Sequence, residues 1–256
     1  MRFRIKFNRT GRHRMLPMDY QYYINAWIYK VLDKADPEFS DFLHTRGYVS
    51  EGKQFKLFCY SPLDFGRPRL WKEKVLFEIL QDELSLDVSF LLAEAAEKFI
   101  IGLFNSQELY LGDRFNGLDL VVKQVERLTD PVILNSMTYK ATSPVVIGFR
   151  DESKYPQYIG PETDGYSTFL RRNVMSKYNA VNGKDGLDDN FKFDFTFTGT
   201  LKSKLVTIKS NTPEESKIKG FVYTFTLSCP QEIHKLILAT GLGEKNSIGF
   251  GWVEVN

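Results

Sequence analysis

The C-terminal stretch of residues 241–255 contains four glycines within eleven residues, together with a lysine and two polar side chains. These residues are Gly241, Gly243, Gly249 and Gly251, with Lys245, Asn246 and Ser247 between them. Glycine is favoured where φ must be positive or where another backbone or a ligand comes close. Backbone N–H groups in such a loop can bind phosphate oxygens, as Lys245 can through its charge. A tight connection that ends in a buried strand explains the glycines equally well.

The elements around this loop exclude the two common nucleotide-binding motifs. Pro230 and the helical spacing of the apolar residues that follow predict a helix that ends at Gly241. The apolar residues at 250–255 predict a strand after the loop. Dinucleotide and nucleoside-triphosphate sites have the reverse order, strand then loop then helix, and no Gly-Lys-Ser/Thr sequence closes this loop.

Positive charge is concentrated near the N-terminus, although the whole chain carries a formal charge of only +2. Residues 2–7 alternate strictly and predict a strand with one apolar face and with Arg2, Arg4 and Lys6 on the other face. The basic face is either solvated or directed towards RNA. A second basic pair, Lys202 and Lys204, is expected in a hairpin, where both can contact phosphates.

Two predicted helices carry a tyrosine and a histidine beside their buried faces. A helix over residues 19–32 places Tyr29 outside the apolar stripe, on a flanking face with Asn25, so the Tyr29 hydroxyl can contact another group. A second helix over residues 36–47 places His44 near its C-terminal end, where the helix dipole favours the protonated imidazole. By residue type alone, both are more often ordinary surface residues than catalysts.

The remaining periodicities give the two halves of the chain the same order of elements. In the first half we expect strands at 2–7, 55–60 with Lys56, 70–80 and 118–128, and helices at 19–32 and 85–104. In the second half we expect strands at 139–149, 191–201, 204–208, 221–228 and 250–255, and helices at 163–181 and after Pro230. Strand, helix, strand, strand, helix, strand is the ferredoxin-like unit, shared with RNA recognition motifs (RRM). The sequence therefore predicts an α+β fold of tandem ferredoxin-like (RRM-like) domains, residues 1–128 and 129–256.

Composition favours a globular protein without a metal site. Hydrophobic residues make up 43% and charged residues 26%, and no apolar run is long enough for a membrane span or a secretion signal, so a cytoplasmic location is expected. Cys59 and Cys229 lie in apolar runs and form no Cys-x-x-Cys pair, and only three histidines are present. The clustered carboxylates of a two-metal nuclease are not recognisable either.

The sequence of residues 241–251, Gly-Leu-Gly-Glu-Lys-Asn-Ser-Ile-Gly-Phe-Gly, resembles the C-terminal signature of the CRISPR-associated endoribonucleases that cut CRISPR repeat RNA into guide RNAs. These enzymes are a branch of the repeat-associated mysterious protein (RAMP) superfamily, and in them the loop lies against RNA. The resemblance implies that precursor CRISPR repeat RNA is the partner. It is expected to bind along this loop and along the basic residues Arg2, Arg4, Lys6, Lys202 and Lys204.

The N-terminal half is similar to the same family at three places. Tyr22-Tyr23 before Ile28-Tyr29, the pair Leu43-His44, and Lys56-Leu57-Phe58 resemble the regions where archaeal members carry a tyrosine, histidine and lysine triad. The resemblance implies that Tyr29, His44 and Lys56 are catalytic. The stretch from His44 to Lys56 is longer than the archaeal pattern, which makes Lys53 an alternative to Lys56.

Such a triad can cleave RNA without a metal or another cofactor. The neighbouring 2′-hydroxyl attacks the phosphate, the lysine holds the developing charge, and the histidine supplies a proton to the departing 5′-oxygen, which yields 2′,3′-cyclic phosphate and 5′-hydroxyl ends. One alternative is a non-catalytic, RNA-binding RAMP subunit of a CRISPR effector complex. Another is a tandem ferredoxin-like protein unrelated to RNA. Whether the chain forms a homodimer is left open.

Overall fold

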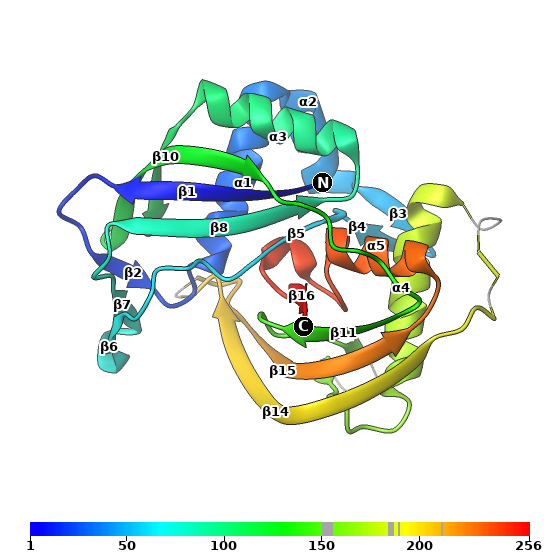
Figure 1. Cartoon of the computed structure of the whole chain (residues 1–256). Coiled ribbons are helices and arrows are strands. Elements are labelled where there is room, and N and C mark those ends of the chain that lie inside the picture. The colour runs from blue at the N-terminus through cyan, green and yellow to red at the C-terminus, as the bar shows by residue number, and fades with distance from the viewer. Residues whose placement is uncertain (150–155, 184–186, 189, 211) are drawn as a thin grey trace.

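The computed structural model describes residues 1–149, 156–183, 187–188, 190–210 and 212–256. Its main elements are two β-sheets, which lie one above the other in Figure 1 with helix α5 (Gln231–Thr240) between them. Residues 182–190 are rich in glycine and aspartate, which predicts a solvated loop, and residues 184–186 and 189 of this segment lie outside the described part.

The N-terminal sheet has the strand order β5-β8-β1-β10-β9, and β1 is antiparallel to both of its neighbours. Its strands are β1 (Arg2–Arg9), β5 (Phe58–Tyr60), β8 (Glu83–Phe90), β9 (Glu108–Gly112) and β10 (Gly117–Arg127). The predicted alternation in β1 is confirmed, since Phe3, Ile5 and Phe7 are buried. These apolar side chains face the helices and form one core with them.

Three helices accompany this sheet: α1 (Gln21–Ala35), α2 (Pro37–Asp41) and α3 (Ala93–Asn105). Trp27 of α1 packs edge-on against Phe7 of β1 and against Phe99 of α3, with ring centroids 5.6 and 5.9 Å apart. Asp36 caps α2 by accepting a hydrogen bond from the Phe39 N–H, and Pro37 occupies the first turn, as the sequence predicts.

The C-terminal sheet has the order β14-β15-β11-β16. Its elements are β11 (Ser136–Ala141), α4 (Tyr166–Asn182), β14 (Asp194–Ile208), β15 (Ser216–Ser228), α5 and β16 (Val253–Val255). If the four strands of each unit are numbered along the chain, both sheets have the order 2-3-1-4 (β1, β5, β8, β10 and β11, β14, β15, β16). The tandem ferredoxin-like fold is therefore confirmed, and each half has its own apolar core.

Smaller elements decorate this frame. The strands β2 (Met15–Pro17), β6 (Arg69–Trp71) and β7 (Leu76–Glu78) form a separate sheet, β3 (Tyr48–Ser50) pairs with β4 (Lys53–Phe55), and β12 (Gly148–Phe149) pairs with β13 (Gln157–Tyr158). The short helical turns are η1 (Phe42–Arg46), η2 (Lys72–Lys74) and η3 (Asn246–Ile248). No helix in the described part of the chain is both long and apolar enough to span a membrane.

The helix predicted over residues 85–104 is wrong in its first part. Residues 83–90 form strand β8, and only 93–105 are helical. Leu84, Leu86, Val88 and Phe90 alternate along β8 and are all buried, so period two, not the helical period, describes this stretch.

Two other strand predictions are also wrong. The neighbour of β5 is β8, whereas residues 70–80 form β6 and β7 in the separate sheet. The chain does not turn between Lys202 and Lys204: both lie within the single long edge strand β14, which forms a hairpin with β15 and whose pairing shifts register between Thr198 and Lys202 near Gly199. Gly199, which has a positive φ inside this strand, marks a bulge and not a turn.

The predicted strand at 55–60 is interrupted at Lys56 and Leu57. Phe55 ends β4, Phe58 begins β5, and Lys56 lies between them. Leu57 has φ of +54°, which a continuous strand does not allow. Lys56 is consequently not a strand residue.

Candidate active site

Tyr29, His44 and Lys56, here called the candidate triad, come together from three separate segments. The Tyr29 ring on α1 packs edge-on against the His44 imidazole, with 5.0 Å between ring centroids and 86° between planes. The Lys56 Nζ donates a hydrogen bond of 2.7 Å to the His44 backbone carbonyl. His44 itself is exposed, so its imidazole is open to a ligand.

The segment that carries His44 is a π-helical turn that directly continues α2. A hydrogen bond of 2.7 Å from the Gly47 N–H to the Phe42 carbonyl closes the turn. Such turns are rare and frequently occur at functional sites. Gly47 has φ of +62°, and a Cβ there would lie 2.6 Å from the Phe55 carbonyl and 3.3 Å from the Lys56 Nζ. Glycine at this position therefore allows Lys56 to approach His44.

Burial tunes two members of the candidate triad. It raises the pKa of Tyr29, so the phenol stays protonated at neutral pH and can donate a hydrogen bond but not act as a base. It lowers the pKa of Lys56, because a partly enclosed ammonium loses hydration. Ser40 Oγ donates to the Tyr29 carbonyl at 3.2 Å and ties α2 to α1 beside the triad.

Lys56 also faces the other half of the molecule. It lines a cavity of about 180 Å³ whose opposite wall includes Lys177, Thr240, Asn246 and Ser247. This cavity lies between the N-terminal half and the loop of residues 241–251, here called the glycine loop. The candidate triad and the glycine loop therefore meet across one seam.

Helix α1 connects the two regions directly. The Asn25 amide donates a 2.7 Å hydrogen bond to the Ser247 carbonyl in the glycine loop, and Tyr29 lies one turn further along the same helix. On the predicted flanking face of α1, Asn25 thus contacts the glycine loop and Tyr29 contacts His44. Gly249 packs on this helix as well, since a Cβ there would lie 2.9 Å from Gln21 Cγ and 3.0 Å from Tyr60 Cε2.

The glycines of the loop are buried against protein. All four have positive φ, between +74° and +92°. A Cβ at Gly243 would lie 2.5 Å from the Val146 carbonyl, and one at Gly251 would lie 2.0 Å from the Leu242 carbonyl. Packing of the loop on its own protein therefore accounts for these glycines. RNA binding by the loop stays a prediction, and Lys245 is its exposed side chain.

A buried lysine that sequence reasoning missed supports the loop from below. Lys177 of α4 is 3% exposed and donates to the Gly241 carbonyl at 2.7 Å and to Asn246 Oδ1 at 2.6 Å. Asn246 in turn donates to the carbonyls of Leu242 and Phe250. Burial lowers the pKa of Lys177 to about 7, against opposing effects of Cys59 and Glu244.

A signal for Lys177 was present in the sequence. Leu170, Val174, Lys177 and Tyr178 follow each other at helical spacing, which puts this lysine on the buried face of the predicted helix. A lysine in such a position needs polar partners, because an unpaired buried charge is costly. Asn246, predicted as an RNA contact, is one of those partners.

The basic face of β1 is paired within the protein. Arg4 forms a bidentate ion pair with Asp87, Lys6 pairs with Glu126 at 2.7 Å, and the Arg2 guanidinium lies 4.7 Å from the centre of the Trp252 ring. Arg2 therefore contacts the C-terminal half and is not a freely solvated cation. Lys202 and Lys204 are exposed on β14. RNA binding by these five residues remains a prediction.

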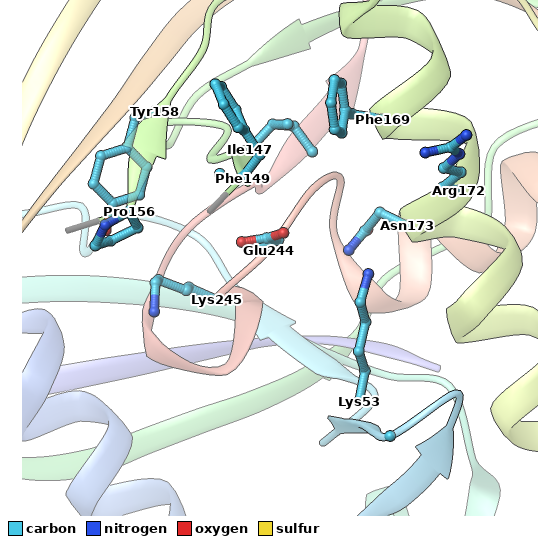
Figure 2. A pocket seen from close by; sticks show the side chains of 12 residues that line it. Lys53, Ile147, Phe149, Pro156, Tyr158, Phe169, Arg172, Asn173, Glu244 and Lys245 are labelled. Atoms are coloured by element: carbon cyan, nitrogen blue, oxygen red, sulfur yellow. The ribbon is translucent and has the colours of Figure 1, made fainter. Parts of the chain in front are cut away.

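Lys53, the alternative to Lys56, lies in a different place. It lines a second, larger cavity of about 740 Å³ together with Arg172, Asn173, Glu244 and Lys245 (Figure 2), here called the Glu244 pocket. Lys56 is the lysine bonded to the His44 segment. In the described part of the chain, no three His, Cys, Asp or Glu side chains are grouped to hold a metal ion.

Comparison with known proteins assigns the family. The family model described as "CRISPR-associated protein Cas6, N-terminal" matches residues 15–126, and "CRISPR associated protein Cas6, C-terminal" matches residues 128–255. The CRISPR-associated endoribonuclease Cas6 1 of Methanocaldococcus jannaschii is 26% identical over 253 residues, covering 95% of this chain and 89% of that protein. The CRISPR-associated endoribonuclease Cas6 of Pyrococcus furiosus is 26% identical over 264 residues, covering 100% and 90%.

Solved structures share the fold along the whole chain. A Cas6-related protein from Pyrococcus furiosus has a TM-score of 0.82 at 23% identity, covering 100% of this chain and 98% of that chain. A structure described as a RAMP protein binding different RNA substrates has a TM-score of 0.80 at 20% identity, covering 100% and 99%. The two family models match both halves, so the chain belongs to the Cas6 family of CRISPR-associated proteins.

Proposed function

We propose that this chain is a metal-independent endoribonuclease that cleaves CRISPR repeat RNA in precursor transcripts and so generates guide crRNAs. Relatives named as Cas6 endoribonucleases support the activity and the substrate class. The observation that carries the proposal is the convergence of Tyr29 and Lys56 on the exposed His44. The proposed domains, 1–128 and 129–256, contribute the candidate triad and the glycine loop respectively.

Each member of the triad has a distinct role in the proposed reaction. The 2′-hydroxyl releases its proton to solvent water and attacks the adjacent phosphate, while the bond from phosphorus to the 5′-oxygen breaks. His44 gives a proton to that oxygen, since imidazole exchanges protons near neutral pH. Lys56 uses donors not engaged by the His44 carbonyl to hold the charged phosphate oxygens.

Tyr29 is a positioning residue in this scheme. Its ring contacts the His44 imidazole edge-on and holds it in place. Its protonated hydroxyl can donate a hydrogen bond to the RNA. The products carry 2′,3′-cyclic phosphate and 5′-hydroxyl ends. The proposed setting is the cytoplasm.

The test is incubation of the protein with labelled CRISPR repeat RNA in excess EDTA and, in parallel, with magnesium. Equal cleavage in both, with a cyclic phosphate at the new 3′ end, supports the proposal. Repeat RNA with a 2′-deoxy nucleotide just before the cut site should then bind with wild-type affinity and resist cleavage, because the nucleophile is absent. Cleavage that requires magnesium contradicts the mechanism, and binding without any cut identifies the non-catalytic RAMP alternative.

A further inference from the structure

The Glu244 pocket is a cavity of about 740 Å³ that the candidate triad does not line. Its walls come from β12 and β13, from α4, from the β3–β4 hairpin and from the glycine loop. Its volume of about 740 Å³ lies within the range of small-molecule sites, so a nucleotide fits with space to spare. Figure 2 shows Glu244 at the centre, with Lys53, Asn173 and Lys245 around it.

One side of the pocket is aromatic. Phe149 and Phe169 stack with 5.9 Å between ring centroids and 27° between planes, and Tyr158 lies beyond Phe149 on the same side of Glu244 in Figure 2. All three rings line the cavity and are only partly buried by the protein. Aromatic side chains of this kind bind unpaired nucleobases by stacking.

Two polar side chains, Glu244 and Asn173, line the interior. The Glu244 carboxylate forms no ion pair with any residue that the structure describes; burial raises its pKa, and Lys245, Lys53, Lys177 and a hydrogen bond from the Gly148 N–H oppose that rise. Asn173 is 5% exposed, and its Oδ1 has no hydrogen-bond partner within the described chain. This oxygen is shielded from the cavity, and Figure 2 shows the amide nitrogen of Asn173 directed into the pocket, where it can donate to a ligand.

Positive charge lies at the rim. Lys53, Arg172 and Lys245 line the pocket and are exposed, so the opening can accept a phosphate while the interior accepts hydrogen bonds. A carboxylate accepts two parallel hydrogen bonds and donates none. Guanine presents two adjacent donors, N1–H and the N2 amino group, on its Watson–Crick edge, and the other three bases do not.

We propose that the Glu244 pocket binds one unpaired guanine of the RNA, with its Watson–Crick edge on the Glu244 carboxylate and its ring against the Phe149–Phe169 pair. Asn173 pairs with a remaining polar atom of the base, and the rim cations contact the flanking phosphates. This inference rests on the proposed function, because it assigns the guanine to the RNA substrate. It makes the pocket a specificity site that is separate from the candidate triad.

The test is affinity for short labelled oligouridines that carry a single G, A or C, measured at one salt concentration, together with GMP and AMP as free nucleotides. Wild-type protein should prefer the G-containing RNA by at least about fivefold, the lower end for one bidentate base contact. Glu244→Gln should abolish this preference, because the amide replaces one acceptor by a donor. Phe169→Leu should weaken binding of every base, and Glu97→Gln on the distant surface of α3 is the matched control.

The outcomes separate the pocket from the proposed function. RNA that is bound and cleaved without preference for G, and without response to Glu244→Gln, overturns the inference and leaves the endoribonuclease proposal intact. Preference for A over G overturns it too. Selective binding of GMP that depends on Glu244, in a protein that neither binds nor cuts repeat RNA, supports a guanine pocket and rejects the proposed function.

Discussion

The candidate triad and the glycine loop meet at one seam, but they differ in what surrounds their key groups. The His44 side chain is exposed and packs edge-on against the Tyr29 ring. The glycines and Asn246 are buried, and their neighbours are carbonyls, helix α1 and Lys177. A residue that chemistry requires and a residue that the fold requires can thus lie side by side. Substitutions should separate the two regions: changes in the triad reduce the rate, and changes in the loop reduce stability.

The sharpest test of this difference is His44→Ala. We expect cleavage of repeat RNA to slow by about 10²–10⁴, the usual contribution of one acid–base group. The urea unfolding midpoint and the RNA affinity should stay near wild type, because the side chain is exposed. His13→Ala is the matched control, since His13 is also exposed and its imidazole bonds to the Asp119 carboxylate. Unfolding of the variant, or cleavage at the wild-type rate, contradicts the assignment.

Substitution of Lys56 and of Lys53 compares a lysine of the candidate triad with a lysine of the Glu244 pocket. Lys56→Ala should lower the single-turnover rate by about 10²–10³, as expected for loss of a preorganised charged donor. Lys53→Ala should leave that rate nearly unchanged and weaken RNA binding slightly. If the two losses are equal and small, neither lysine holds the developing charge.

The loop side of the comparison is tested by Gly251→Ala. A positive φ costs a non-glycine residue about 1–3 kcal/mol, and overpacking against the Leu242 carbonyl adds about 1–3 kcal/mol. The free energy of unfolding, from urea denaturation, should therefore fall by at least about 2 kcal/mol. Gly52→Ala is the matched control, because Gly52 has φ of +73° but no atom within 4 Å of its missing Cβ. Equal effects at both glycines would mean that close packing of the loop contributes nothing.

Per pH unit, the smallest expected change in the free energy of unfolding comes from Lys177 beneath the loop. Its pKa is lowered to about 7 in the folded protein from 10.5, so between these values the unfolded chain binds more protons. The free energy of unfolding should accordingly rise with pH in this window, by up to about 1.4 kcal/mol per unit from this group. Lys177→Met should remove that part of the slope. A wild-type slope identical to that of the variant would show that Lys177 stays protonated when folded.

Local patterns in the sequence were sufficient for much of this protein. The alternation in β1, the stripe of α1, the Asp36-Pro37 helix start and the four glycines act over a few residues, where sterics and periodicity determine the conformation. They led to the repeated ferredoxin-like order and, through resemblance, to the Cas6 family. They failed at residues 83–90, because the alternation of this strand was merged with the helical pattern that begins only at Ala93.

Tertiary structure decided everything that depends on residues far apart in the chain. The sequence could not show that Lys56, and not Lys53, bonds to the His44 segment, because a π-turn, Gly47 and a break at Leu57 jointly determine that contact. Nor could it show that Arg4 and Lys6 are paired, since Asp87 and Glu126 reach them only through strand register. The Glu244 pocket likewise needs five separate segments at once. Local propensities do not encode which distant segments pack together, because that choice minimises the free energy of the whole chain.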